Sequence, residues 1–195
     1  TVQAAAAGRP RVVSFDLKGS WVNRTTAPDG AEVLKDNNLR RGGLGFRGEK
    51  KLPLGVTPEQ RHALLHALHA DSSLLCSLGV MDYSLLLGAF EQAESATVAH
   101  FLHGNSLSPA QLGLICGSEE QGRDLVVGVI DVLQMWNCGK RAEQCAKTVL
   151  QGKSKRGLSA VPPVEYQQRF MAFMREVFGS TSEKWRMHDD LRLLL

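Results

Sequence analysis

Short apolar runs, separated by segments rich in glycine, proline and charge, divide this chain of 195 residues into expected strands and helices. A strand is predicted over residues 11–17, where β-branched and aromatic side chains are frequent. Residues 83–90 and 125–130 also have the length and composition of buried strands. Residues 25–56 lack such runs and indicate a loop, apart from a short ordered piece at 33–39.

Two longer segments show the features of helices. The first begins with a capping box formed by Thr57 and Gln60 and is expected to end near Leu78, at Gly79. The second is expected over residues 164–178. Both should pack into the core through apolar faces made of Leu64, Leu65, Leu68, Leu75 and Leu78 in the first helix and Tyr166, Phe170, Phe173, Met174 and Phe178 in the second.

Two aspartates stand at the ends of predicted strands. Asp82 comes directly before the 83–90 run, and Asp131 directly follows the 125–130 run. Paired carboxylates suit phosphoryl transfer, because one can accept the proton of an attacking hydroxyl while the other holds a metal ion on the phosphates. Spacing alone favours the plainer alternative that both aspartates cap strand ends.

A turn of Lys18, Gly19 and Ser20 follows the first strand, and Arg24 comes a few residues later. Glycine lets the backbone approach a ligand closely, and the neighbouring cations would suit an anion. The segment is therefore either a hairpin with solvated charges or a turn that contacts phosphate.

Composition narrows the classes of protein. The net charge of +3 is too small to imply a nucleic-acid partner by itself. The four cysteines show no C-x-x-C spacing, which argues against a zinc ribbon and for reduced, intracellular thiols. No apolar run reaches the roughly 18–20 residues that a membrane span needs. Residues 1–10 are expected to be a flexible segment and residues 181–195 a tail.

Basic residues concentrate after Asp131. Between Gly139 and Gly157, only Glu143 opposes Lys140, Arg141, Lys147, Lys153, Lys155 and Arg156. Such a run is usually just solvated, but it could also bind an anionic membrane, with about 1 kcal/mol from each cation near acidic lipid. Nucleic acid is the competing partner. We expect no nucleic-acid partner, because Trp136 is the only aromatic residue in 135–160 and a stacking platform for bases needs more.

Several motifs resemble those of the phosphatidylinositol phosphate kinases, in that family's order. They are Phe-Asp-Leu-Lys-Gly-Ser at 15–20, Met-Asp-Tyr-Ser-Leu-Leu-Leu-Gly at 81–88, Gly-Val-Ile-Asp at 128–131, and Val-Pro-Pro at 161–163 followed by Tyr166, Arg169 and Phe170. The resemblance implies an α+β, kinase-like C-terminal lobe, with an antiparallel sheet and packed helices. The N-terminal lobe would be missing or truncated.

The resemblance also implies how the chain is organised. Residues 11–180 would form a partial catalytic domain, with a variable insert at about 91–123 and an activation or specificity loop at about 135–158. The chain lacks an initiator methionine and is expected to be cut from a longer protein.

The implied activity is transfer of the ATP γ-phosphate to an inositol ring at a membrane, with ATP and Mg²⁺ as cofactors. Asp82 corresponds to the catalytic aspartate, and Asp131 to the aspartate that binds Mg²⁺ and nucleotide. Lys18, a catalytic and phosphate-binding candidate, and Arg24 would contact phosphate. In the specificity loop, Lys140, Arg141 and Glu143 would contact the lipid.

The lipid substrate stays open at this stage. Asn23-Arg24 and the Asp-Asn-Asn-Leu sequence at 36–39 favour a phosphatidylinositol 3-phosphate 5-kinase, whereas Leu133-Gln134 and the Pro-Pro start of the last helix favour a phosphatidylinositol 4-phosphate 5-kinase. The 4-phosphate enzyme is our first prediction, and a non-catalytic, membrane-binding remnant is a further alternative. The resemblance implies a cytoplasmic protein, peripherally bound to the cytosolic face of plasma or endosomal membrane, and is compatible with a homodimer.

Overall fold

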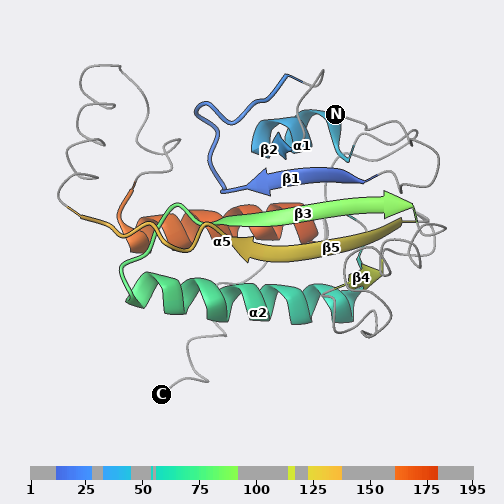
Figure 1. The fold of residues 1–195 in the computed structure, drawn as a ribbon. Helices are drawn as coiled ribbons and strands as arrows, with labels where there is room; N and C mark the ends of the chain where they lie inside the picture. The colour runs from blue at the N-terminus through green and yellow to red at the C-terminus, as the bar shows by residue number, and fades with distance from the viewer. Residues whose placement is uncertain are drawn as a thin grey trace, which may run out of the picture.

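The computed structural model describes residues 12–27, 33–44, 54, 56–91, 114–116, 123–137 and 161–179. In these ranges the chain forms an α+β arrangement, as predicted, with helices beside a single sheet (Figure 1). In chain order the elements are β1 (Val13–Leu17), β2 (Leu34–Lys35), α1 (Asp36–Gly42), α2 (Pro58–Ser77), β3 (Ser84–Glu91), β4 (Leu114–Cys116), β5 (Arg123–Ile130) and α5 (Pro163–Phe178).

The five strands lie in the order β2-β1-β3-β5-β4. Three of the strand pairs, β1 with β3, β3 with β5 and β4 with β5, are antiparallel as predicted. The prediction of a purely antiparallel sheet is wrong at one edge, because β2 pairs with β1 in parallel. Two parallel strands cannot be joined by a hairpin, and β2 runs directly into α1. The sheet is therefore mixed.

The strand register brings three chain segments to the same end of the sheet. Leu17, the last residue of β1, lies opposite Leu85 near the start of β3. Ser84, the first residue of β3, lies opposite Ile130, the last residue of β5. In Figure 1 the arrowheads of β1 and β5 accordingly lie beside the point where β3 begins. Residues just beyond these strand ends must be close in space.

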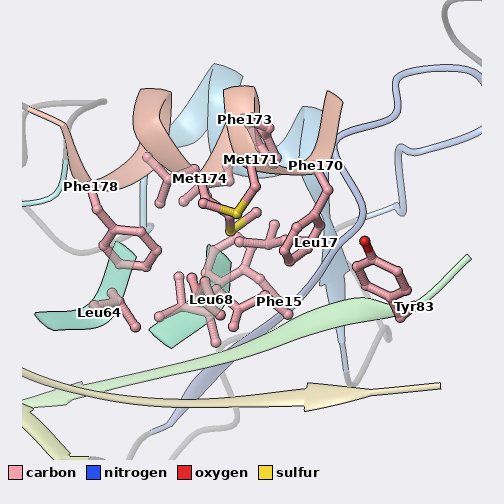
Figure 2. Packing of buried hydrophobic residues seen from close by; sticks show 14 of the residues in the cluster. Phe15, Leu17, Leu64, Leu68, Tyr83, Phe170, Met171, Phe173, Met174 and Phe178 are labelled. Atoms are coloured by element: carbon pink, nitrogen blue, oxygen red, sulfur yellow. The ribbon is translucent and has the colours of Figure 1, made fainter. Parts of the chain in front are cut away.

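The hydrophobic core lies between the sheet and helices α2 and α5. Figure 2 shows Leu64 and Leu68 of α2 and several aromatic and methionine side chains of α5 meeting Phe15 and Leu17 of β1. The predicted apolar face of α5 is confirmed, because Tyr166, Phe170, Phe173, Met174 and Phe178 are all buried. Burial of such side chains contributes about 1.5–3 kcal/mol each relative to exposure.

Helix α2 has the expected ends. The Thr57 side chain accepts a hydrogen bond from the Gln60 N–H (3.3 Å), and Gln60 Oε1 accepts one from the Thr57 N–H (3.2 Å). The prediction that Leu78 belongs to the apolar face is wrong: the side chain is 56% exposed, because the helix stops at Ser77 and the chain turns away. In the described ranges, neither α2 nor another helix combines the length and apolarity that crossing a bilayer requires.

Candidate active site

The side chains of Lys18, Asp82 and Asp131 meet at the sheet end where β1, β3 and β5 come together. Lys18 Nζ lies 3.1 Å from Asp82 Oδ1 and 3.6 Å from Asp131 Oδ2. It also donates a hydrogen bond of 2.6 Å to the backbone carbonyl of Asp82. One ammonium group thus lies between two carboxylates that are far apart in the sequence.

Both aspartates have an unusual backbone conformation. The φ angle is +64° at Asp82 and +62° at Asp131, in the left-handed region that glycine favours. Aspartate tolerates this region better than most residues, but the conformation still has an energetic cost. Non-glycine residues with such angles cluster at functional sites, where the surrounding fold stabilises them. Capping a strand end does not require this conformation, so the geometry favours a functional interpretation.

A short piece of backbone pairing holds the two aspartate-bearing loops together. Val80 and Met135 form an isolated antiparallel bridge. Next to this bridge, the Met81 N–H donates to the Gln134 carbonyl and the Trp136 N–H donates to the Gly79 carbonyl, both at 2.9 Å. The loop before β3 is therefore fastened to the loop after β5, which limits the movement of one carboxylate relative to the other.

Exposure increases from one member of the group to the next. The exposed fraction of the side chain is 11% for Lys18, 26% for Asp82 and 57% for Asp131. The group is open to solvent through Asp131, while Lys18 lies at its base. A ligand can therefore reach both carboxylates without the core opening.

The turn that carries Lys18 is fixed by a buried acid, Asp36. Its Oδ1 accepts hydrogen bonds from the backbone N–H groups of Lys18 (3.0 Å), Gly19 (2.7 Å) and Ser20 (3.2 Å). Gly19 has a φ of +68°, and a Cβ at this position would lie 3.0 Å from the Arg169 carbonyl oxygen of α5. The turn therefore needs glycine both for its conformation and for its contact with α5.

Arg24 lies beneath the same turn rather than within the Lys18 group. Its Nε donates to Asp36 Oδ2 at 2.6 Å, and its Nη2 lies 3.1 Å from Asp16 Oδ1. Burial by itself would lower the pKa of Arg24, but the charge of Asp36 and the hydrogen bond to Asp16 outweigh it and raise that pKa. The guanidinium is bound to these two acids, so the predicted contact of Arg24 with phosphate gains no support from this geometry.

Asn38, in the Asp-Asn-Asn-Leu sequence at 36–39, also has a structural role. Its Oδ1 accepts from the Thr26 N–H (2.9 Å) and its Nδ2 donates to the Thr26 carbonyl (2.8 Å). A carboxylate could not donate the second bond. The amide therefore anchors the segment between β1 and β2, away from the two aspartates.

Several predicted features lie outside the described residues. These are Lys140, Arg141 and Glu143, the segments 1–10 and 181–195, and most of the expected insert and specificity loop. One part of the expected insert is described: residues Leu114–Cys116 form β4, which pairs with β5. Sequence reasoning missed β4, and it also missed the role of Asp36.

Two carboxylates around a single cation make a donor set that suits a hard metal ion. Mg²⁺ is commonly bound by one or two carboxylates together with waters and substrate phosphates. Both carboxylates already face a positive charge, because the Lys18 ammonium forms an ion pair with Asp82 and with Asp131. Asp131, the more exposed of the two, is the residue better placed to hold a metal ion that arrives with a nucleotide.

Comparison with known proteins identifies the family. The sequence model described as phosphatidylinositol-4-phosphate 5-kinase matches residues 9–112 and 113–177 of this chain. The chain belongs to this family. The matched ranges contain Lys18, Asp82 and Asp131, so the group that the fold brings together lies within the region that the family model covers.

Individual relatives of this phosphatidylinositol phosphate kinase chain differ in the reactions that their names state. A human 1-phosphatidylinositol 3-phosphate 5-kinase is 28% identical over 91% of this chain. An Arabidopsis thaliana 1-phosphatidylinositol-3-phosphate 5-kinase is 27% identical over 88% of it. A Danio rerio phosphatidylinositol 5-phosphate 4-kinase type-2 gamma is 29% identical over 85%.

The chain corresponds to a limited part of each of these relatives. It spans 7% of the human protein, 8% of the Arabidopsis protein and 49% of the Danio rerio protein. Family membership is therefore established for this region, while the activity of the whole protein is proposed below.

Proposed function

We propose that the protein transfers the γ-phosphate of ATP to a ring hydroxyl of a membrane phosphoinositide. The observation that carries this proposal is the convergence of Lys18, Asp82 and Asp131 within 3.1–3.6 Å at one open end of the sheet. Phosphoryl transfer depends mainly on positioning and on electrostatic stabilisation, and these three side chains offer both. A kinase-like arrangement of lobes is part of the same proposal.

Each of the three residues has a main role. Asp82 is partly shielded from solvent and accepts the proton of the attacking inositol hydroxyl. Lys18 lies at the base of the group, where its ammonium stabilises negative charge that develops on the transferred phosphoryl group. Asp131, at the exposed rim, would hold the metal ion that accompanies the nucleotide.

The residues present fit Mg²⁺, as their arrangement around the Lys18 ammonium indicates. Asp131 would hold the ion with help from Asp82, and the ion would neutralise charge on the β- and γ-phosphates. The carboxylates supply at most two protein ligands, which leaves coordination positions for phosphate oxygens and water.

For the acceptor lipid we place phosphatidylinositol 3-phosphate ahead of phosphatidylinositol 4-phosphate, which the sequence motifs had ranked first. The human and Arabidopsis relatives carry the name of 3-phosphate 5-kinases, and this supports the change of order. Such a substrate requires peripheral binding to the cytosolic face of a membrane. In this proposal Lys140, Arg141 and Glu143 contact the lipid headgroup.

The test is a phosphoryl-transfer assay on the full-length protein. Radiolabelled ATP is supplied with liposomes that contain the 3-, 4- or 5-monophosphate of phosphatidylinositol. The variants Asp82→Asn and Asp131→Asn should each lose about 10³-fold or more in kcat/KM, while melting temperatures stay near the wild-type value. Asp71→Asn, an acid-to-amide change on the exposed surface of α2, is the matched control. Wild-type turnover in either active-site variant would remove the assignment.

A further inference from the structure

The geometry points to Asp36 as a positioning residue, which acts through the backbone of the 18–20 turn to hold the Lys18 ammonium between the two carboxylates. Asp36 is completely buried and contacts neither Asp82 nor Asp131 in the described hydrogen bonds. Its two oxygens accept four hydrogen bonds, three from successive N–H groups of the turn and one from Arg24. The inference rests on the proposed function where it concerns catalysis.

The parallel pairing of β2 explains how Asp36 reaches this place. Phe15 lies opposite Leu34 and Asp16 lies opposite Lys35, so the next residue along β2 comes beside Leu17 at the end of β1. That residue is Asp36, the first of α1. Its carboxylate therefore lies directly under the turn that follows β1, although it is 18 residues from Lys18 in the sequence.

A charged acceptor is needed at this point for two reasons. Three adjacent N–H groups converge on a single oxygen, and a buried N–H without an acceptor is costly. The buried Arg24 also requires an acid, and it donates to the other oxygen of Asp36 while also binding Asp16. An amide in place of Asp36 could face the three N–H groups with its oxygen, but its NH₂ would then oppose the Arg24 Nε–H.

Loss of the hydrogen bonds from Asp36 should change the position of the Lys18 side chain. The turn is fixed by Asp36 on one side and by the contact of Gly19 with α5 on the other, and Lys18 extends from it towards both aspartates. When one side is released, the ammonium shifts relative to the reacting phosphoryl group. Displacement of about 1 Å at a catalytic group can cost about 100-fold in rate.

The primary experiment measures the position of Lys18 independently of activity. Wild-type and Asp36→Asn full-length proteins are treated briefly with an acetylating reagent, and the rate at Lys18 is compared by mass spectrometry with the rate at the remaining lysines. Lys18 is 11% exposed and ion-paired, so it should react slowly in the wild type and about tenfold faster in the variant. Glu176→Gln is the matched control, since it makes the same change at an exposed ion pair with Arg40 and should leave Lys18 labelling unaltered.

A second experiment, enzyme kinetics, distinguishes a role of Asp36 in positioning Lys18 from a role in overall stability alone. Asp36→Asn should lower kcat about 10- to 100-fold while the KM values for ATP and lipid change less than about threefold, because Lys18 is used in the transition state. If Asp36→Asn does not fold, Arg24→Lys replaces it. Lysine keeps the positive charge but lacks the planar guanidinium that binds Asp36 and Asp16 together. Lys18 labelling and kcat should therefore change in the same directions, by smaller factors.

The outcomes distinguish the two proposals. Faster Lys18 labelling without any phosphoryl transfer by the wild type would support the anchor and remove the proposed function. Folded variants whose Lys18 labelling and kcat equal those of the wild type would overturn the inference. A lower melting temperature with unchanged relative labelling of Lys18 would also overturn it, because Asp36 would then be only a stabilising residue.

Discussion

The hydroxyl group of Tyr166 donates a hydrogen bond to the backbone carbonyl of Tyr83, the residue that follows Asp82. The two rings also meet edge to face, with centroids 4.7 Å apart. Helix α5 is thereby connected to the loop that holds Asp82. This bond is buried, so a missing partner would leave the Tyr83 carbonyl unpaired away from water.

The first prediction compares two tyrosine-to-phenylalanine changes. Tyr166→Phe should lower the free energy of unfolding by about 1–2 kcal/mol, because it leaves the Tyr83 carbonyl unsatisfied. Tyr83→Phe should change it by less than about 0.5 kcal/mol or stabilise the protein, since the Tyr83 hydroxyl is buried and finds no hydrogen-bond partner within the described ranges. Denaturant titration of both variants checks the difference. Equal losses would contradict the assignment of the bond to Tyr166.

The second prediction concerns two glycines with different surroundings. Gly19→Ala should destabilise the protein by about 1–3 kcal/mol, because φ is +68° and the added Cβ would press on the backbone of Arg169 and Phe170. Gly128→Ala serves as the matched change in β5, where a Cβ meets nothing within 4 Å. There alanine should be neutral or stabilise by about 0.5–1 kcal/mol. Thermal unfolding under one set of conditions should show a clearly lower melting temperature for Gly19→Ala and an unchanged or higher one for Gly128→Ala.

The two long helices could be predicted because the sequence patterns that indicate them are local. The capping box at Thr57 and the aromatic stripe of α5 depend on residues three or four positions apart, and the structure has both elements where the sequence indicated them. The sequence placed Asp82 and Asp131 at strand ends, but their convergence depends on the pairing of β3 with β5, which joins distant parts of the chain. An antiparallel pair joins the start of one strand to the end of the other, so acids at those two positions must be neighbours.

The anchor at Asp36 could not be predicted, because its partners leave no mark in the sequence. It binds backbone N–H groups, which every residue except proline has, and they belong to a turn at a distance of 16 to 18 residues. The parallel pair that brings it there has only two registered positions. The exposed position of Leu78 was missed for a related reason: its helical spacing was right, but the helix had already ended.

The third prediction concerns the dependence of stability on pH. Burial alone would raise the pKa of Asp16, but the hydrogen bond and the positive charge of Arg24 outweigh it, and the pKa lies below its ordinary value of 3.8. A lowered pKa in the folded state means that the contribution of Asp16 is complete above 3.8 and is lost as the pH falls through the folded value. Wild type should therefore be more stable than Asp16→Asn above that pH, and the two curves should converge below it.

Melting temperatures measured from pH 6 down to about pH 2.5 check this behaviour. Asp71→Asn, on the exposed surface of α2, controls for the removal of one negative charge and should follow the wild-type curve closely. A constant gap between wild type and Asp16→Asn over the whole range would mean that the loss comes from packing rather than from the ion pair with Arg24.

The last prediction concerns competition between Lys18 and a metal ion. The ammonium of Lys18 lies between the two carboxylates that would bind Mg²⁺, so the lysine reduces the negative potential that a metal ion meets there. Lys18→Met removes this charge and keeps an unbranched side chain of similar length. It should therefore strengthen the binding of Mn²⁺, used as a paramagnetic substitute, by about two- to fivefold, which corresponds to partly exposed ion pairs of about 0.5–1 kcal/mol. Phosphoryl transfer should fall at the same time, because the charge that stabilises the transferred group is lost.

Electron paramagnetic resonance titration of free Mn²⁺ measures the affinity, and the double variant Lys18→Met, Asp131→Asn should bind the ion weakly. Weaker Mn²⁺ binding in Lys18→Met alone would mean that the lysine organises the two carboxylates for the metal instead of competing with it.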